Sequence, residues 1–265
     1  IYLHVPFCVR KCRYCDFVTY AGREGLIPDY VDALVAEIEA VPGRWAGDLP
    51  PVSSVFWGGG TPSLLPPGAF ARVHAAIGRV FGWRGGPAAA EVTVEANPET
   101  VDADYWAALR AGGVNRVSLG VQSFQPAGLR ALDRDHDAAT ALRAVEAARR
   151  AGLTDVSLDL IFGWEGQTDA DWRADLDRAI AIAPTHLSLY ALTIEEGSAL
   201  FADIARGRVV APDDDRQADC YDLAVARLGA AGYEGYEISN WAYRPPGAPP
   251  GANRSRHNSL YWRNG

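Results

Sequence analysis

The stretch Cys8–Cys15, with the sequence CVRKCRYC, holds three of the four cysteines in this chain of 265 residues. Their spacing is C-x3-C-x2-C, and no second cysteine pair follows to complete the closed ligand set of a structural zinc site. Thiolates grouped in this way on one loop favour a [4Fe–4S] cluster in which one iron stays open to a small molecule. Basic residues lie between the cysteines and are expected to favour the thiolate over the thiol. We therefore predict that Cys8, Cys12 and Cys15 are the only protein ligands of such a cluster, the alternative being structural thiols or half of a zinc site.

The composition is that of an ordinary globular chain with an excess of acidic residues. Hydrophobic residues make up 48%, the mean hydropathy is -0.09, and no apolar run approaches the ~20 residues that a membrane-spanning helix needs. The formal net charge of -8 argues against a nucleic-acid partner, because phosphate binding needs a basic surface. The cysteine distribution does not form a secreted disulfide framework, which favours a reducing, cytoplasmic setting.

Short β-type runs alternate with amphipathic helical patterns along most of the chain. The runs are Ile1–Val5, Val52–Trp57, Glu91–Ala96, Asn115–Gln122, Asp155–Phe162 and His186–Thr193. The helical patterns, with apolar residues at i, i+3, i+4 and i+7, cover Ile27–Ile38, Phe70–Val80, Ala103–Leu109, Ala138–Ala151 and Trp172–Ile182. This alternation predicts parallel strands with right-handed crossovers. Since the units fall short of a closed eight-stranded barrel, we predict an α/β fold, a partial (β/α)6 barrel similar to a TIM barrel.

The regular alternation ends in the last quarter of the chain. We predict one more helix over Asp213–Ala231, in which Cys220 is a small buried hydrophobe. A strand over Tyr233–Trp241 and an irregular Pro/Gly loop over Arg244–Ser255 follow. These patterns divide the chain into a barrel domain, residues 1–232, and a C-terminal segment, residues 233–265, which we expect to begin a further region that the chain contains only in part.

Polar residues gather where the predicted strands end. The cysteines follow the first run, Gly58–Gly60 and Thr61 follow the second, Glu95 ends the third, Gln122 ends the fourth, and Asp159 lies within the fifth. In barrels of parallel strands the chemistry lies at the carboxyl ends of the strands. We therefore expect these residues to share one site.

Each of these signals also has a plain structural explanation. The glycines could form only a tight turn, and Glu95 could be an ordinary carboxylate at a strand end. Asp159 faces away from its leucine neighbours, where ribose hydroxyls or nearby backbone groups would satisfy it. Tyr2 and His4 share the polar face of the first strand, and His4 is as readily a hydrogen-bonded core histidine as a ligand.

A set of motifs gives the chain a family resemblance. In chain order they are YLHVPFC at 2–8, GGGTP at 58–62, VEANP at 94–98, LGVQSF at 119–124 and DLIFG at 159–163. Together with the cysteine loop, they resemble the radical S-adenosylmethionine (SAM) superfamily and, within it, the oxygen-independent coproporphyrinogen III oxidase-like family. The true oxidases carry a further cysteine two positions after the third cluster cysteine, where this chain has Phe17. The motif H-N-x-x-Y-W, here His257–Trp262, is typical instead of the haem chaperones of that family.

The resemblance implies a radical SAM type of barrel that binds a [4Fe–4S] cluster, SAM and haem. The positions matching cofactor-contacting residues of the family are Tyr2, Tyr14, Gly58, Gly59, Gly60, Thr61, Glu95, Gln122, Arg134, Asp159 and Ala191. The resemblance also implies reductive cleavage of SAM, an electron donor such as a flavodoxin or ferredoxin, and delivery of haem to an accepting protein, with membrane contact only through that acceptor. The alternatives are the oxidase itself, which decarboxylates coproporphyrinogen III, and a binding module with a structural metal.

For haem, the resemblance points to His257. A neutral imidazole is a common protein ligand of haem iron. Tyr261 and Trp262 offer flat faces to a porphyrin, and the arginines at 254, 256 and 263 could meet its propionates. Without the resemblance, the same residues would describe an aromatic strand end with an exposed histidine.

Overall fold

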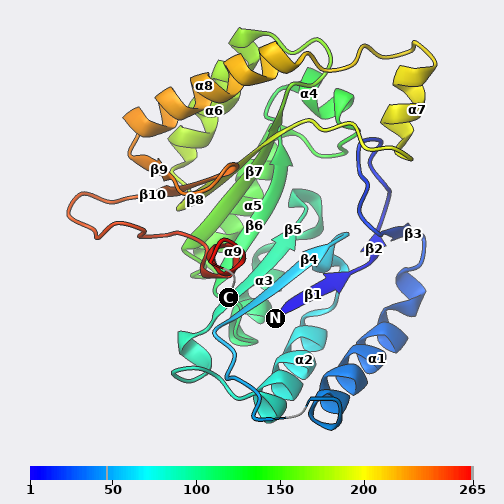
Figure 1. Ribbon diagram of the computed structural model, residues 1–265, viewed down its shortest axis with the longest axis vertical. Helices are drawn as coiled ribbons and strands as arrows, with labels where there is room; N and C mark the ends of the chain where they lie inside the picture. Colours follow the sequence, from blue (N-terminus) through cyan, green and yellow to red (C-terminus); the bar gives the residue numbers. More distant parts are fainter. Residues whose placement is uncertain (46, 264–265) are drawn as a thin grey trace.

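The fold is described by a computed structural model for residues 1–45 and 47–263. Its centre is one curved sheet with the strand order β1-β4-β5-β6-β7-β8-β10-β9 (Figure 1). The strands are β1 (Tyr2–Val5), β4 (Ser54–Gly59), β5 (Glu91–Ala96), β6 (Arg116–Gln122), β7 (Asp155–Phe162), β8 (His186–Ala191), β9 (Tyr233–Gly235) and β10 (Asn240–Tyr243). From β1 to β8 every neighbouring pair in this order is parallel. β1 and β9 are the free edges, so the predicted partial (β/α)6 barrel is confirmed.

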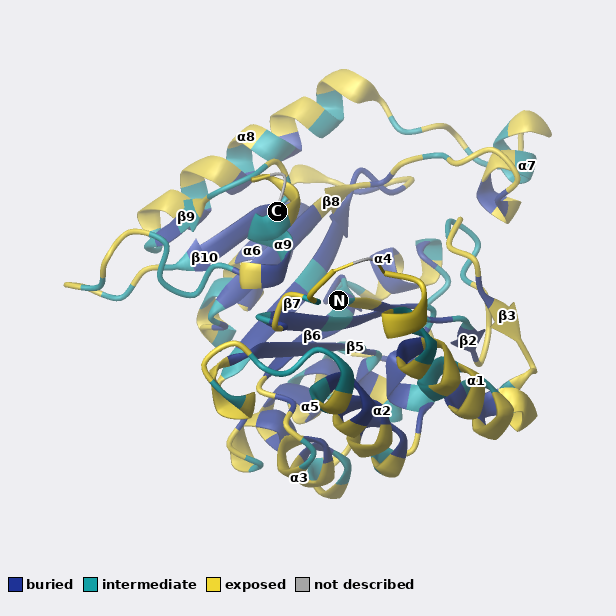
Figure 2. Cartoon of the chain, turned by 60° about the horizontal axis from the view of Figure 1, so that its bottom comes forward, coloured by how far each residue is buried: buried dark blue, intermediate teal, exposed yellow. Residues whose placement is uncertain are grey.

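Helices return the chain between the parallel strands and cover the outer face of the sheet (Figures 1 and 2). The helices of the described residues are α1 (Ile27–Ala40), α2 (Pro67–Val80), α3 (Ala103–Ala111), α4 (Pro126–Ala131), α5 (Ala138–Arg150), α6 (Asp169–Ile182), α7 (Ala199–Ala205), α8 (Asp214–Ala230) and α9 (Arg256–Tyr261). The last of them, α9, lies on the inner side of the sheet instead. Short 3-10 turns cover Glu24–Leu26, Val41–Gly43, Pro62–Leu64, Pro87–Ala89 and Pro98–Thr100, and a separate small parallel pair joins β2 (Phe7–Cys8) to β3 (Tyr20–Ala21). None of the helices in residues 1–45 and 47–263 has the length and apolar character needed to cross a membrane.

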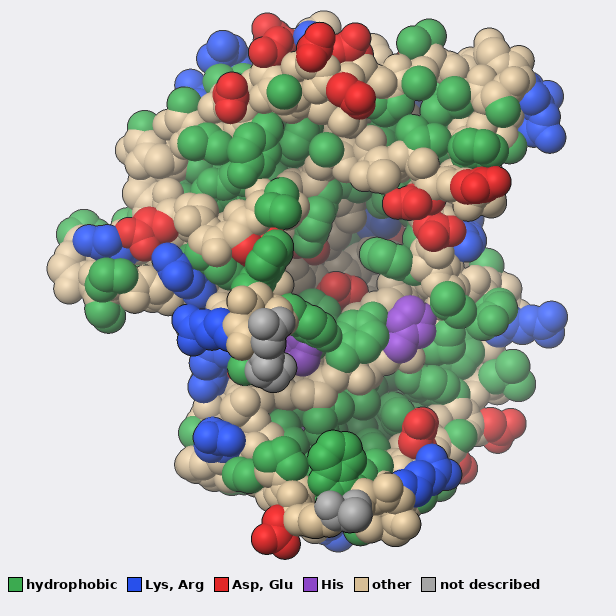
Figure 3. Space-filling view, in the orientation of Figure 1, with side chains coloured by type: hydrophobic (Ala, Val, Ile, Leu, Met, Phe, Trp, Pro, Cys, Tyr) green, Lys and Arg blue, Asp and Glu red, His purple; other side chains and the backbone are tan. Residues whose placement is uncertain are grey.

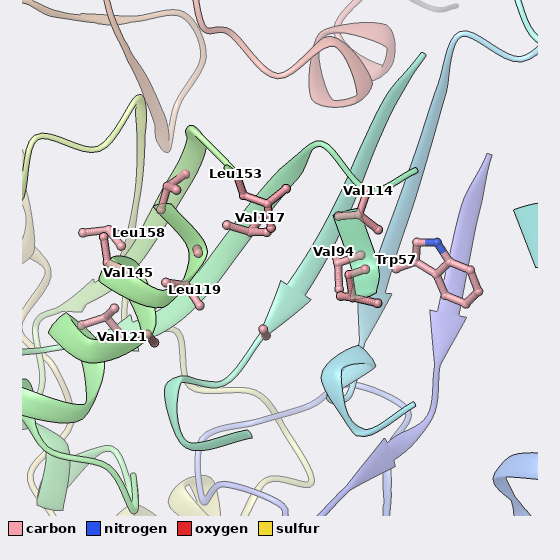
Figure 4. Packing of buried hydrophobic residues seen from close by; sticks show 14 of the residues in the cluster. Trp57, Val94, Val114, Val117, Leu119, Val121, Val145, Leu153 and Leu158 are labelled. Atoms are coloured by element: carbon pink, nitrogen blue, oxygen red, sulfur yellow. The ribbon is translucent and has the colours of Figure 1, made fainter. Parts of the chain in front are cut away.

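The two faces of the sheet differ in polarity because side chains alternate along each strand. On β5, Val92 and Val94 belong to the apolar core under the helices, whereas Thr93 and Glu95 line the inside of the barrel. The same alternation on β6 sends Val117 and Leu119 outward into the packing shown in Figure 4. The hydrophobic core therefore lies between sheet and helices, and the inside of the barrel, which we call the lumen, is polar.

The predicted strand over Tyr233–Trp241 is wrong in one respect, because the chain turns within it. β9 and β10 are antiparallel neighbours, and β10 continues the sheet by pairing antiparallel with β8. Glu237 stabilises the turn by accepting hydrogen bonds from Ser239 N at 3.0 Å and from the Asn240 amide. The other predicted runs match within a few residues, the loop over 244–255 has no helix or strand, and Cys220 is buried on α8. Residues 264–265 of the C-terminal segment lie outside the described residues.

We predict that Leu119→Ala lowers the free energy of unfolding by about 2–5 kcal/mol, because the side chain is fully buried and its removal leaves a cavity. Urea denaturation would measure the change. The matched control Val225→Ala, at a 45% exposed position on α8, should stay within about 0.5 kcal/mol of the parent. Equal effects of the two substitutions would contradict the placement of the core.

Candidate cofactor site

A cavity of about 410 Å³ lies at the carboxyl ends of the parallel strands. The molecule is visibly hollowed on this side, and acidic side chains are exposed inside the hollow (Figure 3). Most of the residues predicted from the sequence line this cavity: Cys8, Cys12, Tyr14, Cys15, Gly59, Gly60, Thr61, Glu95, Gln122, Arg134, Asp159 and Ala191. Tyr2, Gly58 and His257 are not among its lining residues. The barrel thus brings together groups that are up to 183 residues apart in sequence, from Cys8 to Ala191.

The cysteine loop presents its thiols to polar donors that suit thiolates. Thr61 Oγ1 donates to Cys8 Sγ at 3.5 Å, and Arg134 Nη1 donates to Cys12 Sγ at 3.7 Å. The loop turns back on itself through a bond from Cys15 N to Cys12 O at 3.1 Å. Within residues 1–45 and 47–263, no group of three or more His, Cys, Asp or Glu side chains is already drawn together at metal-binding distances. The three thiols therefore line the same cavity without being in contact as a group. The hydrogen-bond donors next to Cys8 and Cys12 would stabilise the negative charge of thiolate ligands.

Ion pairs anchor this loop to the rest of the barrel. Arg10 contacts Asp133 at 3.1 Å, and Arg13 contacts Asp203 at 2.8 Å, which ties the loop to the turn after α4 and to α7. At Cys15, the basic neighbour Lys11 favours the thiolate as expected, but burial has the larger effect. Burial raises the pKa of that thiol above its ordinary value, although the nearby lysine lowers it.

The glycines at the end of β4 are required by the close approach of other chain segments. A Cβ on Gly60 would lie 2.6 Å from Phe7 O and 3.0 Å from Cys8 Sγ, and a Cβ on Gly59 would lie 2.7 Å from the His4 ring. Gly59 also has φ 112°, which side chains rarely adopt. Its N–H donates to Glu95 Oε2 at 3.2 Å. Gly58 and Gly59 end strand β4 rather than form a tight turn, so close packing accounts for the glycines, and a ligand contact would be an additional role.

Two polar residues occupy unusual positions beside the cysteines. Gln122 has φ 64° at a register shift between β6 and β7, a left-handed conformation that costs a non-glycine residue about 1 kcal/mol or more. Strained positions of this kind cluster at ligand-binding sites. Arg134 donates from Nη2 to Asn97 Oδ1 at 2.7 Å and to Gly120 O at 3.0 Å, so its guanidinium is held in place next to Cys12.

The buried carboxyl groups of Glu95 and Asp159 in the cavity have raised pKa values. Burial, with a contribution from Asp159, raises the pKa of Glu95 to about 8. Burial also raises the pKa of Asp159 to about 6, against hydrogen bonds from serine hydroxyls that lower it. Ser118 Oγ reaches both Asp159 oxygens, at 2.9 and 3.1 Å. Tyr190, which we did not select from the sequence, lines the cavity beside these carboxyl groups.

A second cavity of about 180 Å³ occupies the lumen beneath the first one. It shares Glu95, Asp159 and Tyr190 with the cavity of the cysteines. Tyr2 and His257 line this second cavity, so the structure places them next to the predicted site rather than in it. The inward hydroxyls that line it share a sequence signal, one serine or threonine between apolar residues in each of the strands β5 to β8: Thr93, Ser118, Ser157 and Ser188.

His257 lies at the opposite end of the barrel from the cysteines, next to the first residues of β4 and β5. It is 6% exposed on α9, so the exposed histidine at a strand end that the residue types alone suggested is not observed. Its Nδ1 pairs with Ser54 Oγ at 2.9 Å, and its ring stacks on Phe56 at 5.3 Å between centroids. The buried Glu91 carboxylate accepts from His257 N at 2.9 Å and from Arg256 N at 2.8 Å, which fixes the start of the helix.

The second ring nitrogen of His257, Nε2, has a lone pair that could bind a metal. Burial lowers the pKa of His257 to about 4, so the ring is neutral at pH 7. Its Nε2 is buried and finds no hydrogen-bond partner in the described part of the chain.

A profile described as the Radical SAM superfamily matches residues 2–179, more than half of the chain. The chain belongs to the radical SAM superfamily. Members of this superfamily bind a [4Fe–4S] cluster and SAM, and the lining of the cavity at the strand ends fits both groups: sulfur ligands with donors around them, and polar residues that could hold an amino acid and a ribose.

Relatives with assigned functions match this radical SAM chain over its whole length. The chain is 43% identical to the haem chaperone HemW of Mycobacterium tuberculosis, covering 100% of this chain and 66% of that protein. It is 40% identical to mouse radical S-adenosyl methionine domain-containing protein 1, mitochondrial, of which it covers 57%. The chain therefore spans somewhat less than two thirds of the length of these relatives.

Among solved structures, coproporphyrinogen III oxidase (HemN) from Escherichia coli is similar to this chain. The TM-score is 0.79 at 29% identity, over 91% of this chain and 55% of the oxidase. The likeness supports the partial barrel.

We predict that Glu95→Gln flattens the pH dependence of stability. Because the pKa of Glu95 is raised from 4.5 to about 8, the folded protein holds a proton that the unfolded chain has released. The contribution of Glu95 to the free energy of unfolding should therefore fall as the pH rises from about 5 to 8, with each unit of pKa shift equivalent to about 1.4 kcal/mol at most. Buried histidines with lowered pKa values, His186 and His257, oppose this fall below pH 6.5, so it should be clearest above that pH. Asp159 contributes to the fall only below about pH 6.

Urea denaturation of the metal-free protein between pH 5 and 8.5 would test this. Glu95→Gln should lose the fall above pH 6, whereas Glu146→Gln, on the exposed face of α5, should keep it. A parental slope in the Glu95 variant would show that this carboxyl group is already ionised at neutral pH.

Proposed function

We propose that the chain is the radical SAM part of a haem chaperone, which binds haem and delivers it to an accepting protein. The observation that carries this proposal is the 43% identity to HemW over the whole chain, which includes the H-N-x-x-Y-W motif at its end. Clustered reduced thiols suit the cytoplasm, where such a cluster would be assembled and reduced by a flavodoxin- or ferredoxin-like donor.

In this proposal the cavity at the strand ends holds the cluster and SAM. Cys8, Cys12 and Cys15 would be the ligands of the cluster. Glu95, Gln122, Arg134 and Asp159 would contact SAM, together with the glycine backbone and Tyr14, Thr61 and Ala191. When bound, the cluster would supply the electron for one-electron reduction of SAM. The protein would orient SAM with buried hydrogen-bond donors and acceptors. Burial in the lumen sets the protonation of the two carboxyl groups among them, Glu95 and Asp159.

Haem would be held by His257 at the other end of the lumen. The neutral imidazole with an unpaired Nε2 supports this role, and Tyr261 and Trp262 remain 65% and 56% exposed, which leaves flat faces for a porphyrin. The lumen cavity of about 180 Å³ is smaller than the ~300–1,000 Å³ of typical ligand pockets. Haem would therefore reach this imidazole only when α9 moves away from Glu91, and the Pro/Gly loop before α9 would permit that movement.

The oxidase alternative has support from the structural likeness to HemN. Phe17 argues against it, because this side chain takes the place of the additional cysteine and lies 63% exposed at the cavity. Anaerobic reconstitution separates the two functions. A chaperone should bind haem and leave coproporphyrinogen III unchanged, whereas decarboxylation of coproporphyrinogen at a catalytic rate would establish the oxidase.

We predict that serine substitution of Cys8, Cys12 or Cys15 removes the cluster, with loss of the ~400 nm absorbance and of bound iron and sulfide. Cys220→Ala should retain both, because Cys220 lies on α8 and does not line the cavity. Loss of iron from the Cys220 variant would overturn the assignment of the ligands.

We predict that His257→Ala abolishes or strongly shifts the Soret band of the haem complex and leaves the iron–sulfur content unchanged. His4→Ala is the matched control, since His4 lies near the cysteine cavity and its Nε2 is engaged with Val18 O at 2.8 Å. If the His257 variant gives a parental Soret band, haem is bound elsewhere.

A further inference from the structure

A chain of hydrogen bonds runs along the wall of the lumen from the C-terminal motif toward the cofactor site. Asn258 Nδ2 donates to Tyr236 Oη at 3.3 Å, and Tyr236 Oη lies 2.8 Å from His186 Nε2. His186 Nδ1 lies 2.8 Å from Ser157 Oγ, which in turn lies 3.5 Å from Ser188 Oγ. We call these residues the lumen relay. It connects the asparagine of H-N-x-x-Y-W to the hydroxyls around Asp159.

The direction of donation in the relay follows from its first members. Tyr236 Oη accepts from Asn258 Nδ2 and from Ser255 N, at 3.4 Å, so its single hydrogen is free to be donated to His186 Nε2. Burial lowers the pKa of His186 well below its ordinary value, so the ring is neutral and has one N–H. That proton must then be on Nδ1, where it is donated to Ser157.

The relay ends at Ser157 and Ser188, the serines nearest to the Asp159 carboxyl group along β7 and across the β7–β8 pair. With Ser157 Oγ accepting from His186, its own hydrogen is free to be donated onward. Hydrogen bonds from Ser188, Ser118 and Ser157 oppose the effect of burial on this carboxyl group, whose pKa is raised by burial to about 6. The geometry supports this surrounding: Ser118 Oγ on β6 donates to Asp159 at 2.9 and 3.1 Å, and Ser188 on β8 is the neighbour of Asp159 across the β7–β8 pair.

We propose that Tyr236 and His186 are positioning residues for Asp159, which fix the serine donors around its carboxylate and connect it to the H-N-x-x-Y-W segment. Neither residue was predicted as a site residue, and neither lines the cavity of the cysteines. The proposal rests on the proposed function in one respect, since it takes Asp159 to be a contact of SAM. It follows that the state of the C-terminal segment influences SAM binding through these hydrogen bonds.

The first test is the affinity for SAM of anaerobically reconstituted protein, measured by equilibrium dialysis. Tyr236→Phe removes one hydroxyl, leaves His186 Nε2 without its donor, and should weaken SAM binding about three- to tenfold. Tyr233→Phe is the matched control. It removes a buried phenol hydroxyl from the same edge of the sheet, where Tyr233 Oη donates to Pro184 O at 2.8 Å outside the relay. It should lower thermal stability without changing the affinity.

The second test is the pH dependence of the same binding reaction. The ionisable groups that face or adjoin Asp159 are Glu95 on β5, Arg116 on β6, and His186 and Tyr190 on β8. Loss of a donor to a carboxylate raises its pKa, so the acid limit of SAM binding should move to higher pH in Tyr236→Phe. Carboxyl ¹³C NMR titration of the metal-free protein should show the same upward shift for Asp159, which tests the relay independently of SAM.

Further variants separate the possible failures. Ser157→Ala should reproduce both effects of Tyr236→Phe, which covers the case in which the tyrosine variant does not fold. Asp159→Ala should weaken SAM binding about ten- to hundredfold at unchanged iron content. If it does so while Tyr236→Phe and Ser157→Ala keep the parental affinity and pH profile, the positioning role is wrong and the SAM site stands. If Asp159→Ala binds SAM like the parent, both the proposed SAM contact and the positioning role are wrong.

Discussion

The polar inner face of the sheet constrains everything else in this barrel. A buried hydroxyl, carboxyl or imidazole costs about 1–3 kcal/mol when it lacks a partner, so each such group in the lumen needs a specific neighbour. Ser118 satisfies Asp159, Ser157 satisfies His186, and Glu91 is satisfied by the start of α9. Because these partners come from different strands, the register of the sheet and the order of its strands are set by polar groups as well as by the apolar core.

The need to pair buried polar groups also orients the side chains of the cofactor site through contacts within the protein itself. Gly59 N–H donates to Glu95, Arg134 is held by Asn97 and Gly120, and the ion pairs of Arg10 and Arg13 fix the cysteine loop. The side chains that would contact SAM are thus oriented by contacts within the protein. Low reorganisation on binding is the physical advantage of such a site. The raised pKa values of Glu95 and Asp159 result from the burial that this arrangement requires.

The C-terminal segment, residues 233–265, is packed as part of the barrel in its described residues, up to residue 263. β10 extends the sheet beyond β8, and α9 closes the lumen at the end opposite to the cysteines. The segment that resembles a haem-binding motif is therefore in contact with the interior that supports the SAM site. The proposed haem ligand His257 and the proposed SAM contacts Glu95 and Asp159 line the same lumen cavity, and the lumen relay begins at Asn258, next to that ligand.

The sequence by itself determined the partial barrel, the cysteine loop and about half of the residues that line the cavity of the cysteines. Strand–helix periodicity and the positions of polar residues at strand ends are local signals, and they are sufficient because parallel strands bring their carboxyl ends together. The turn between β9 and β10 was missed because its stabilising contacts come from the side chain of Glu237, which periodicity does not report. Only the tertiary structure decided that His257 is buried at the far end of the lumen, and that Tyr236 and His186 connect the adjacent Asn258 to Ser157, beside Asp159. Such contacts join residues that are dozens of positions apart, and their partners depend on which strands are neighbours, which no single stretch of sequence specifies.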